Sequence, residues 1–179
     1  MPETAVHAFC HALPGTWHHM AVILSATDAL EWLSRATGLP AAELARLAAA
    51  APDGPSDVLF LPFLGGERTP HNDASIRAAF LGVSHGTGAA TLARAVMEGV
   101  AFALRDGLDA LAAAGSRPSR LVAVGGGARS DAWLGLIATV LGVPVDRPAA
   151  GETGAALGAA RLGMLAATGE DGAGVLTRP

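Results

Sequence analysis

The sequence predicts one α/β domain, and three observations lead to this prediction. Short apolar runs alternate along the chain with longer segments whose apolar residues follow helical spacing. Pro and Gly residues stand at the junctions between these segments, where turns are expected. Neither an internal repeat nor a linker interrupts the 179 residues, so we expect residues 1–179 to form a single domain of helices packed on strands.

The chain opens with two extended runs, residues 4–13 and 16–24, that flank Pro14 and Gly15. A Pro-Gly pair between extended runs is typical of a turn, so the two runs are predicted to pair as strands.

Two short helices are expected next. From Ser25 the apolar positions adopt helical spacing up to Thr37, and Gly38 ends the pattern. Ser25 or Thr27 can cap the first turn of this helix, since both carry a hydroxyl that accepts from free backbone amides. An Ala-rich helix is then expected over residues 41–51.

Two further strands are expected at residues 58–64 and 76–83, joined by the polar loop 65–73. This loop could contact an anionic or hydroxylated ligand. We favour the simpler interpretation, a solvated hairpin with internal pairing of Glu67 and Arg68, because charged loops are the norm at protein surfaces.

The longest helix is predicted over residues 89–113, and small residues recur on one of its faces at steps of four. Such a column lets another backbone approach closely, because no large side chain stands in the way. The column consists of Ala95, Gly99, Ala103 and Gly107.

A buried strand at residues 121–124 runs into three glycines and then into a helix over 131–141. Glycines adopt backbone angles that other residues resist, and a helix start offers free amides and a positive dipole end. The segment therefore suits a nucleotide. A tight turn without a ligand explains the local sequence about as well.

The same turn resembles a degraded dinucleotide fingerprint, with Gly125, Gly127 and Ser130 at its positions and Asp146 after the next predicted strand, 143–145. Two observations count against this alternative. The third glycine is replaced by Ser130, and too few strand and helix units follow to complete a dinucleotide fold.

The last predicted helix, residues 152–167, contains two glycines that each cost about 1 kcal/mol relative to Ala. Close contact with another helix would offset this cost. The functional alternative is a hinge between two domains. The tail, residues 169–179, is Gly-rich and is expected to fray.

Composition excludes several classes of function. The net charge is −4, all 12 basic residues are Arg, and no Arg-rich run occurs, so nucleic-acid binding is not expected. The single cysteine, Cys10, excludes internal disulfides and thiolate zinc sites. The apolar runs are too short to span a membrane and no signal peptide is evident, so we expect a cytoplasmic location.

A histidine metal site is also not expected, although four His residues lie near Cys10. Adjacent His side chains on a strand point to opposite faces, and no carboxylate set lies nearby. The four residues are His7, His11, His18 and His19.

Four segments, residues 7–14, 63–73, 94–106 and 124–130, together resemble the C-terminal domain of the FGGY carbohydrate kinase family, above all its xylulokinase members. The family's second signature also matches, with Thr91 as the one departure from the preferred residue type. The matching positions are Ala78, Phe80, Gly82, Leu92, Ala95, Val96, Met97 and Glu98.

The resemblance implies an actin-like, ribonuclease-H-like ATPase domain with a mixed sheet flanked by helices. It implies that ATP binds to this domain, in a cleft shared with an N-terminal sugar-binding domain that the sequence does not contain. The implied adenosine-pocket residues are Gly126, Gly127 and Ala128, followed at the helix start by Arg129, Ser130 and Asp131. The implied interdomain hinge consists of Gly151, Thr153, Gly154 and Gly158.

The implied reaction is transfer of the ATP γ-phosphate to the 5-hydroxyl of D-xylulose, which requires Mg²⁺ and a base. In this family the base lies in the N-terminal domain, so the chain alone is expected to be inactive and has no catalytic or metal-binding residue assigned. Two alternatives stay open: the corresponding part of another FGGY sugar kinase, or a non-catalytic interaction module, which could form a homodimer through its small-residue faces.

Overall fold

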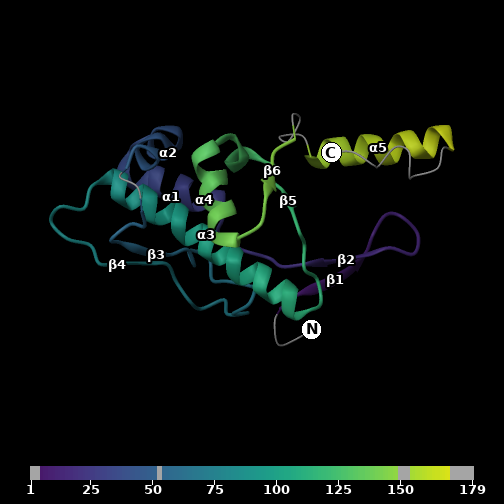
Figure 1. Ribbon diagram of the computed structural model, residues 1–179, viewed down its shortest axis with the longest axis horizontal. Helices are drawn as coiled ribbons and strands as arrows, with labels where there is room; N and C mark the ends of the chain where they lie inside the picture. The colour runs from purple at the N-terminus through teal and green to yellow at the C-terminus, as the bar shows by residue number, and fades with distance from the viewer. Residues whose placement is uncertain (1–4, 52–53, 149–153, 170–179) are drawn as a thin grey trace.

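The computed structural model describes residues 5–51, 54–148 and 154–169 (Figure 1). In chain order the elements are β1 (His7–Cys10), β2 (Trp17–Met20), α1 (Thr27–Thr37), α2 (Ala41–Ala49), β3 (Leu59–Leu61), β4 (Ala79–Leu81), α3 (Ala89–Ala113), β5 (Leu121–Val122), the 3₁₀ helix η2 (Gly126–Arg129), α4 (Asp131–Leu141), β6 (Val145–Asp146) and α5 (Gly154–Thr168).

Helix α3 forms the centre of the fold. Helices α1, α2 and α4 pack against it on one side, and β3 packs on the other (Figure 1). The predicted column of small residues makes the second contact possible: a Cβ added at Gly99 would lie 2.3 Å from the carbonyl oxygen of Phe60 in β3. The prediction that a backbone lies directly on this face is therefore confirmed.

The hydrophobic core lies between these elements and consists mainly of aliphatic side chains. Its fully buried members include Leu44 of α2 and Met97 of α3. At its edge, Trp32 of α1 stacks on Phe60 with a distance of 6.0 Å between ring centroids. The ring centroid of Phe60 in turn lies 4.5 Å from that of Phe80 in β4. Few aromatic residues are needed, because small side chains let the helices pack closely.

The strands form three separate two-stranded ladders in the described residues. The β1–β2 and β3–β4 pairs are antiparallel, and β5–β6 is parallel. The α/β class is confirmed and both strand directions occur, although the described strands pair as separate ladders and not as one mixed sheet. Residues 22–24, which follow β2, are hydrogen-bonded to the polar loop instead: Val22 to the backbone and hydroxyl of Thr69, and Leu24 to the carboxylate of Glu67.

The predicted N-terminal hairpin is confirmed. His7 pairs with Met20 and Cys10 with Trp17, and Gly15 adopts a positive φ of 74° in the connecting turn. The hairpin extends away from the core, and its second strand is exposed along its whole length (Figure 1).

Two local predictions are wrong. Ala26, not Ser25 or Thr27, is the N-cap of α1, and no side chain caps this helix. Strand 121–124 is not buried: Val122 is 46% and Val124 is 57% exposed. Their side chains border a hollow beside α3 and α4 rather than a filled core, so the apolar run indicates a strand but not its burial.

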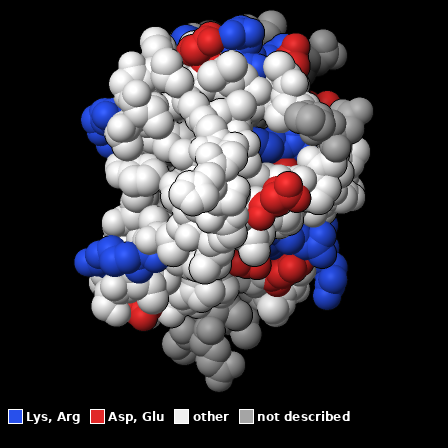
Figure 2. Space-filling model, turned by 90° about the vertical axis from the view of Figure 1, so that its left-hand side faces the viewer, with Lys and Arg blue, Asp and Glu red and all other residues white. Residues whose placement is uncertain are grey.

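None of the described helices is long and apolar enough to cross a membrane. Figure 2 views the molecule from the end that carries the turn before α3, and shows a broad uncharged area with charged side chains in separate groups around it.

Candidate functional site

The glycine turn follows β5 and leads into α4 through a short 3₁₀ helix that the sequence did not predict. Gly125 has a positive φ of 95°, a conformation that favours glycine. Residues Gly126–Arg129 then form η2, and α4 begins at Asp131. Ser130 caps α4, because its side chain accepts a hydrogen bond from the amide of Trp133 at 3.2 Å.

One side of the glycine turn is packed and the other is open. A Cβ added at Gly127 would lie 2.9 Å from Oγ1 of Thr27 and 3.7 Å from the ring of Trp133. A Cβ added at Gly126 would meet nothing within 4 Å. The turn is thus fixed against α1 at one residue and presents bare main chain to open space at the neighbouring one.

That open space is a hollow of about 580 Å³ between the turn and helices α1 and α2. We call it the turn hollow. Its α1 and α2 wall includes Leu30, Glu31 and Ala45. Most residues predicted to bind ATP line it: Gly126, Gly127, Arg129, Ser130 and Asp131. A cavity of this size with apolar and polar walls suits a small organic ligand.

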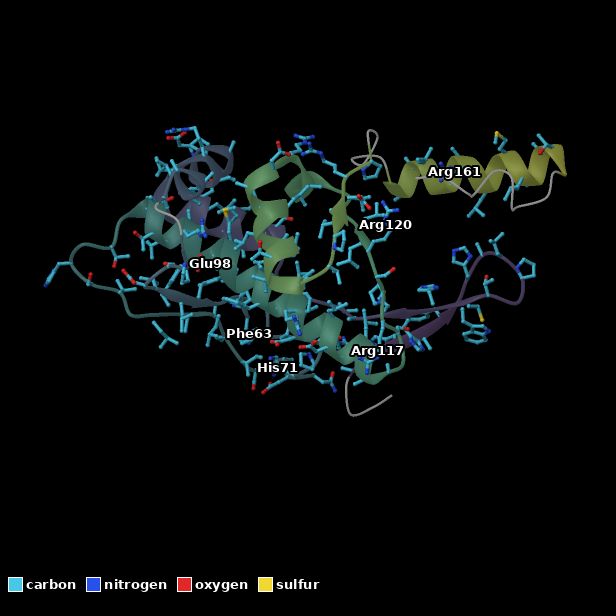
Figure 3. All side chains as sticks on the ribbon, viewed as in Figure 1. Phe63, His71, Glu98, Arg117, Arg120 and Arg161 are labelled. Atoms are coloured by element: carbon cyan, nitrogen blue, oxygen red, sulfur yellow. The ribbon has the colours of Figure 1, made fainter. Side chains whose placement is uncertain are left out.

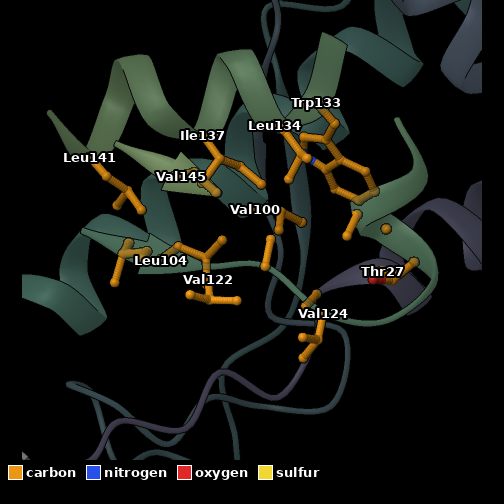
Figure 4. A pocket seen from close by; sticks show the side chains of 15 residues that line it. Thr27, Val100, Leu104, Val122, Val124, Trp133, Leu134, Ile137, Leu141 and Val145 are labelled. Carbon is orange, nitrogen blue, oxygen red and sulfur yellow. The ribbon is translucent and has the colours of Figure 1, made fainter. Parts of the chain in front are cut away.

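Ala128 is placed differently from the other predicted residues. It is 6% exposed and lines a second, smaller hollow of about 360 Å³ between β5, α3 and α4. Figure 4 shows this second hollow, with Val122 and Val124 facing Ile137 and Leu134 across an apolar space. The glycine turn therefore separates two hollows, of which the turn hollow has the greater number of charged residues at its wall.

Charged side chains surround the start of α4. Arg147, directly after β6, donates to Oδ1 of Asp131 at 2.7 Å and to the carbonyl oxygen of Ala128 at 3.0 Å. Sequence reasoning missed Arg147. A signal was present, because the carboxyl ends of parallel strands such as β5 and β6 meet at one edge of a sheet, where ligands bind in open α/β folds.

The polar loop is not the solvated hairpin that we favoured. Glu67 is 2% exposed, and its Oε1 accepts hydrogen bonds from the amides of Leu24 at 2.9 Å and Arg68 at 2.7 Å. Its Oε2 is buried without a hydrogen-bond partner. Thr69 is also buried and binds Val22 through both its backbone and its hydroxyl. The loop therefore stabilises the fold by hydrogen bonds to residues 22–24, which lie far away in the chain.

The exposed part of the same loop has its own local contacts. Phe63 and His71 meet edge to face at 5.1 Å (Figure 3). The hydroxyl and amide of Ser75 donate to Asp73 and hold the pKa of that carboxyl below its ordinary value.

Of the predicted hinge residues that the structure describes, Gly154 begins α5 and Gly158 lies inside this helix. Gly151 and Thr153 lie outside the described residues, as does the predicted tail from residue 170 onward. A Cβ at Gly154 would lie 3.6 Å from Val124, and one at Gly158 would meet nothing within 4 Å. Close helix contact therefore does not explain Gly158 in the described part of the chain, where α5 has no buried residue.

Two histidines of the hairpin lie close together. His11 and His18 rings lie 6.1 Å apart, and the described residues contain no group of three or more His, Cys, Asp or Glu side chains that could hold a metal ion.

Comparison with known proteins identifies the family to which this arrangement belongs. Residues 2–167 match the C-terminal domain of the FGGY family of carbohydrate kinases. The chain belongs to this family. Membership decides against the dinucleotide fingerprint and confirms the actin-like, ribonuclease-H-like class, because the similar solved structures are sugar kinases of that fold.

Individual FGGY relatives are similar over nearly the whole chain. Xylulose kinase from Escherichia coli (strain K12) is 48% identical over 172 residues, which cover 94% of this chain and 35% of the relative. The crystal structure of a "xyloylose kinase" from Brucella ovis superposes with a TM-score of 0.91 at 55% identity, covering 98% of this chain and 36% of that one. Xylulose kinase from Bifidobacterium adolescentis gives a TM-score of 0.75 at 35% identity, covering 93% and 32%. The chain thus spans about a third of the length of these relatives.

Proposed function

We propose that this chain is the nucleotide-binding C-terminal domain of a xylulose kinase and that ATP occupies the turn hollow. The observation that carries the proposal is the bare main chain of Gly126 at the wall of a 580 Å³ hollow, in a domain of the FGGY family. The names of the similar relatives support xylulose as the sugar.

The walls of the turn hollow suit the parts of an adenine nucleotide. Leu30 and Ala45 provide an apolar side for a base, while Gly126 lets the ligand approach the backbone without steric conflict. The start of α4, capped by Ser130, offers the positive end of a helix dipole to phosphate groups. In this proposal the described residues bind and orient ATP and supply no base.

The remaining chemistry belongs to the complete enzyme. When bound, Mg²⁺ would supply positive charge that neutralises the transferring phosphoryl group, and a base would accept the proton from the 5-hydroxyl of D-xylulose. We assign both to the assembled two-domain kinase, in which this chain would face an N-terminal sugar-binding domain. Residues 1–179 would then constitute one domain of that enzyme.

The alternative of an interaction module is not favoured. One of the two small-residue faces that could have served for docking is used inside the fold: Ala95 and Ala103 are buried, and Gly99 lies against Phe60. The other face, Gly154 and Gly158 of α5, has no neighbour within 4 Å of a Cβ at Gly158, so membership of the FGGY family is what counts most against an interaction module. The other alternative, a different sugar kinase of the same family, differs only in its substrate. A phosphoryl-transfer assay with several substrates distinguishes it from a xylulose kinase.

The test is phosphoryl transfer by the complete two-domain protein, with D-xylulose, glycerol and gluconate offered separately and this chain alone as the control. The proposal predicts ATP-dependent formation of xylulose 5-phosphate by the complete protein and no turnover by this chain alone. Phosphorylation of another substrate in preference to D-xylulose would overturn the sugar assignment, and turnover by the chain alone would overturn the assignment of the base to another domain.

A further inference from the structure

The side chain of Arg147 connects β6 to the glycine turn and to the start of α4. Its Nη1 lies 3.0 Å from the carbonyl oxygen of Ala128, 3.4 Å from that of Arg129 and 2.7 Å from Oδ1 of Asp131. The first two acceptors belong to η2 and the third to the first residue of α4. A single guanidinium group therefore joins three points around the proposed ATP site.

These contacts are poorly suited to stabilising the whole fold. The side chains of Arg147 and Asp131 are 43% and 84% exposed, and exposed ion pairs contribute little to the free energy of unfolding. The two carbonyl contacts act on a glycine-rich segment, which has more backbone freedom than any other and therefore most needs an external constraint. Their effect is expected on the conformation of the turn.

The positive charge of Arg147 lies next to the carboxylate of Asp131. Asp131 lines the turn hollow, and its carboxylate would repel the phosphates of a nucleotide if no cation stood beside it. Arg147 supplies that cation at hydrogen-bond distance from the carboxylate.

We propose that Arg147 is a positioning residue for the nucleotide, which holds the glycine turn in its binding conformation and neutralises Asp131 at the wall of the turn hollow. This inference rests on the proposed function, since it requires ATP or ADP to bind there. It assigns to Arg147 no contact with the reacting atoms.

The test compares Arg147→Ala and Arg147→Lys with a matched control, Arg120→Ala. Arg120 also forms an exposed ion pair in this region, but with Asp146 of β6 (Figure 3). Titration calorimetry of the 179-residue chain with ADP and with adenosine gives the affinities, and hydrogen exchange of residues 125–131 reports the order of the turn.

Arg147→Ala is expected to weaken ADP binding about tenfold, the effect of losing charge-assisted hydrogen bonds at a partly exposed site. The loss for adenosine is expected to be smaller, because adenosine carries no phosphate for Asp131 to repel. Exchange at residues 125–131 should become faster. Arg147→Lys should recover part of the ADP affinity, because the charge returns without the planar fork. Arg120→Ala should bind like the wild type.

Two results would overturn the inference alone: ADP affinity of Arg147→Ala equal to that of the wild type, or an equal loss in Arg120→Ala. A wild-type chain that does not bind ADP at all would overturn the proposed nucleotide site, and the inference with it. The two failures are therefore distinguishable.

Discussion

The indole nitrogen of Trp133, in the first turn of α4, donates a 3.1 Å hydrogen bond to the carbonyl oxygen of Met97 in α3. Trp133 is 3% exposed, and its ring also lies beneath Gly127. One side chain therefore ties the glycine turn, the start of α4 and the central helix together. The proposed ATP site is built directly on the hydrophobic core.

Trp133→Phe is expected to lower the free energy of unfolding by about 2 kcal/mol, because it removes a buried hydrogen bond and leaves a small cavity. Urea unfolding measures the loss. Trp17→Phe is the matched control, since Trp17 is 68% exposed and should change stability very little. Equal stability of Trp133→Phe and the wild type would contradict the anchoring role.

Gly127→Ala is expected to cost about 1–2 kcal/mol, because the added methyl group would lie 2.9 Å from Oγ1 of Thr27. Thr27→Ala removes the obstructing atom, so the double variant should recover most of that loss. Gly126→Ala is the control and should be tolerated, since its methyl group meets nothing within 4 Å. Additive losses in the double variant would show that Thr27 is not the obstacle.

Glu67→Ala is expected to destabilise the fold by about 2–3 kcal/mol, because the amides of Leu24 and Arg68 lose their acceptor. Glu67→Gln keeps an accepting oxygen and should retain more stability than Glu67→Ala. Thermal and urea unfolding of both variants provide the comparison. An equal loss of unfolding free energy in the two variants would show that the hydrogen bonds to Oε1 do not stabilise the loop.

Ser75→Ala is expected to raise the pKa of Asp73 toward its ordinary value, because the strongest cause of its lowering is the Ser75 hydroxyl. A carboxyl whose pKa is lowered in the folded state contributes stability above its unfolded pKa, and that contribution is lost as the pH falls through the folded pKa. NMR titration of the Asp73 carboxyl measures the change. Ser84→Ala serves as the control, and an unchanged Asp73 titration in Ser75→Ala would refute the assignment.

The sequence correctly predicted those features whose conformation depends on residues that are neighbours in the chain. Helix α3 has the predicted bounds, Ala89–Ala113, because no Pro interrupts it and its small residues recur at helical spacing. The hairpin turn at Gly15 and the end of α1 at Gly38 were predictable because glycine is the residue expected where the backbone needs a positive φ. Both glycines adopt such an angle in the structure.

The features that sequence reasoning missed depend on residues far apart in the chain. The buried carboxylate of Glu67 accepts a hydrogen bond from Leu24, 43 positions earlier in the chain. The contact of Arg147 with Ala128 spans 19 positions. Neither partner can be read from local spacing, since a charged residue in a loop has the same local pattern whether it is solvated or buried.

At the candidate site, the local sequence predicted the position of the glycine turn but not the helices that pack around it. The three glycines marked the turn correctly, while the turn hollow depends on α1 and α2, which lie some 80 to 100 positions earlier in the chain. The 3₁₀ helix η2 was also unpredictable, because short i→i+3 segments carry little sequence signal.

The most direct test of the account is ATP and ADP binding to this chain before and after Gly126→Leu. A Cβ at Gly126 would meet nothing within 4 Å, so a Leu side chain there is expected to occupy the turn hollow and exclude the nucleotide while the fold stays intact. Gly135→Ala, on the exposed side of α4, is the control. Saturable binding that Gly126→Leu abolishes at an unchanged melting temperature is the predicted result. Equal nucleotide affinity in the wild type and Gly126→Leu would contradict the assignment of ATP to this hollow.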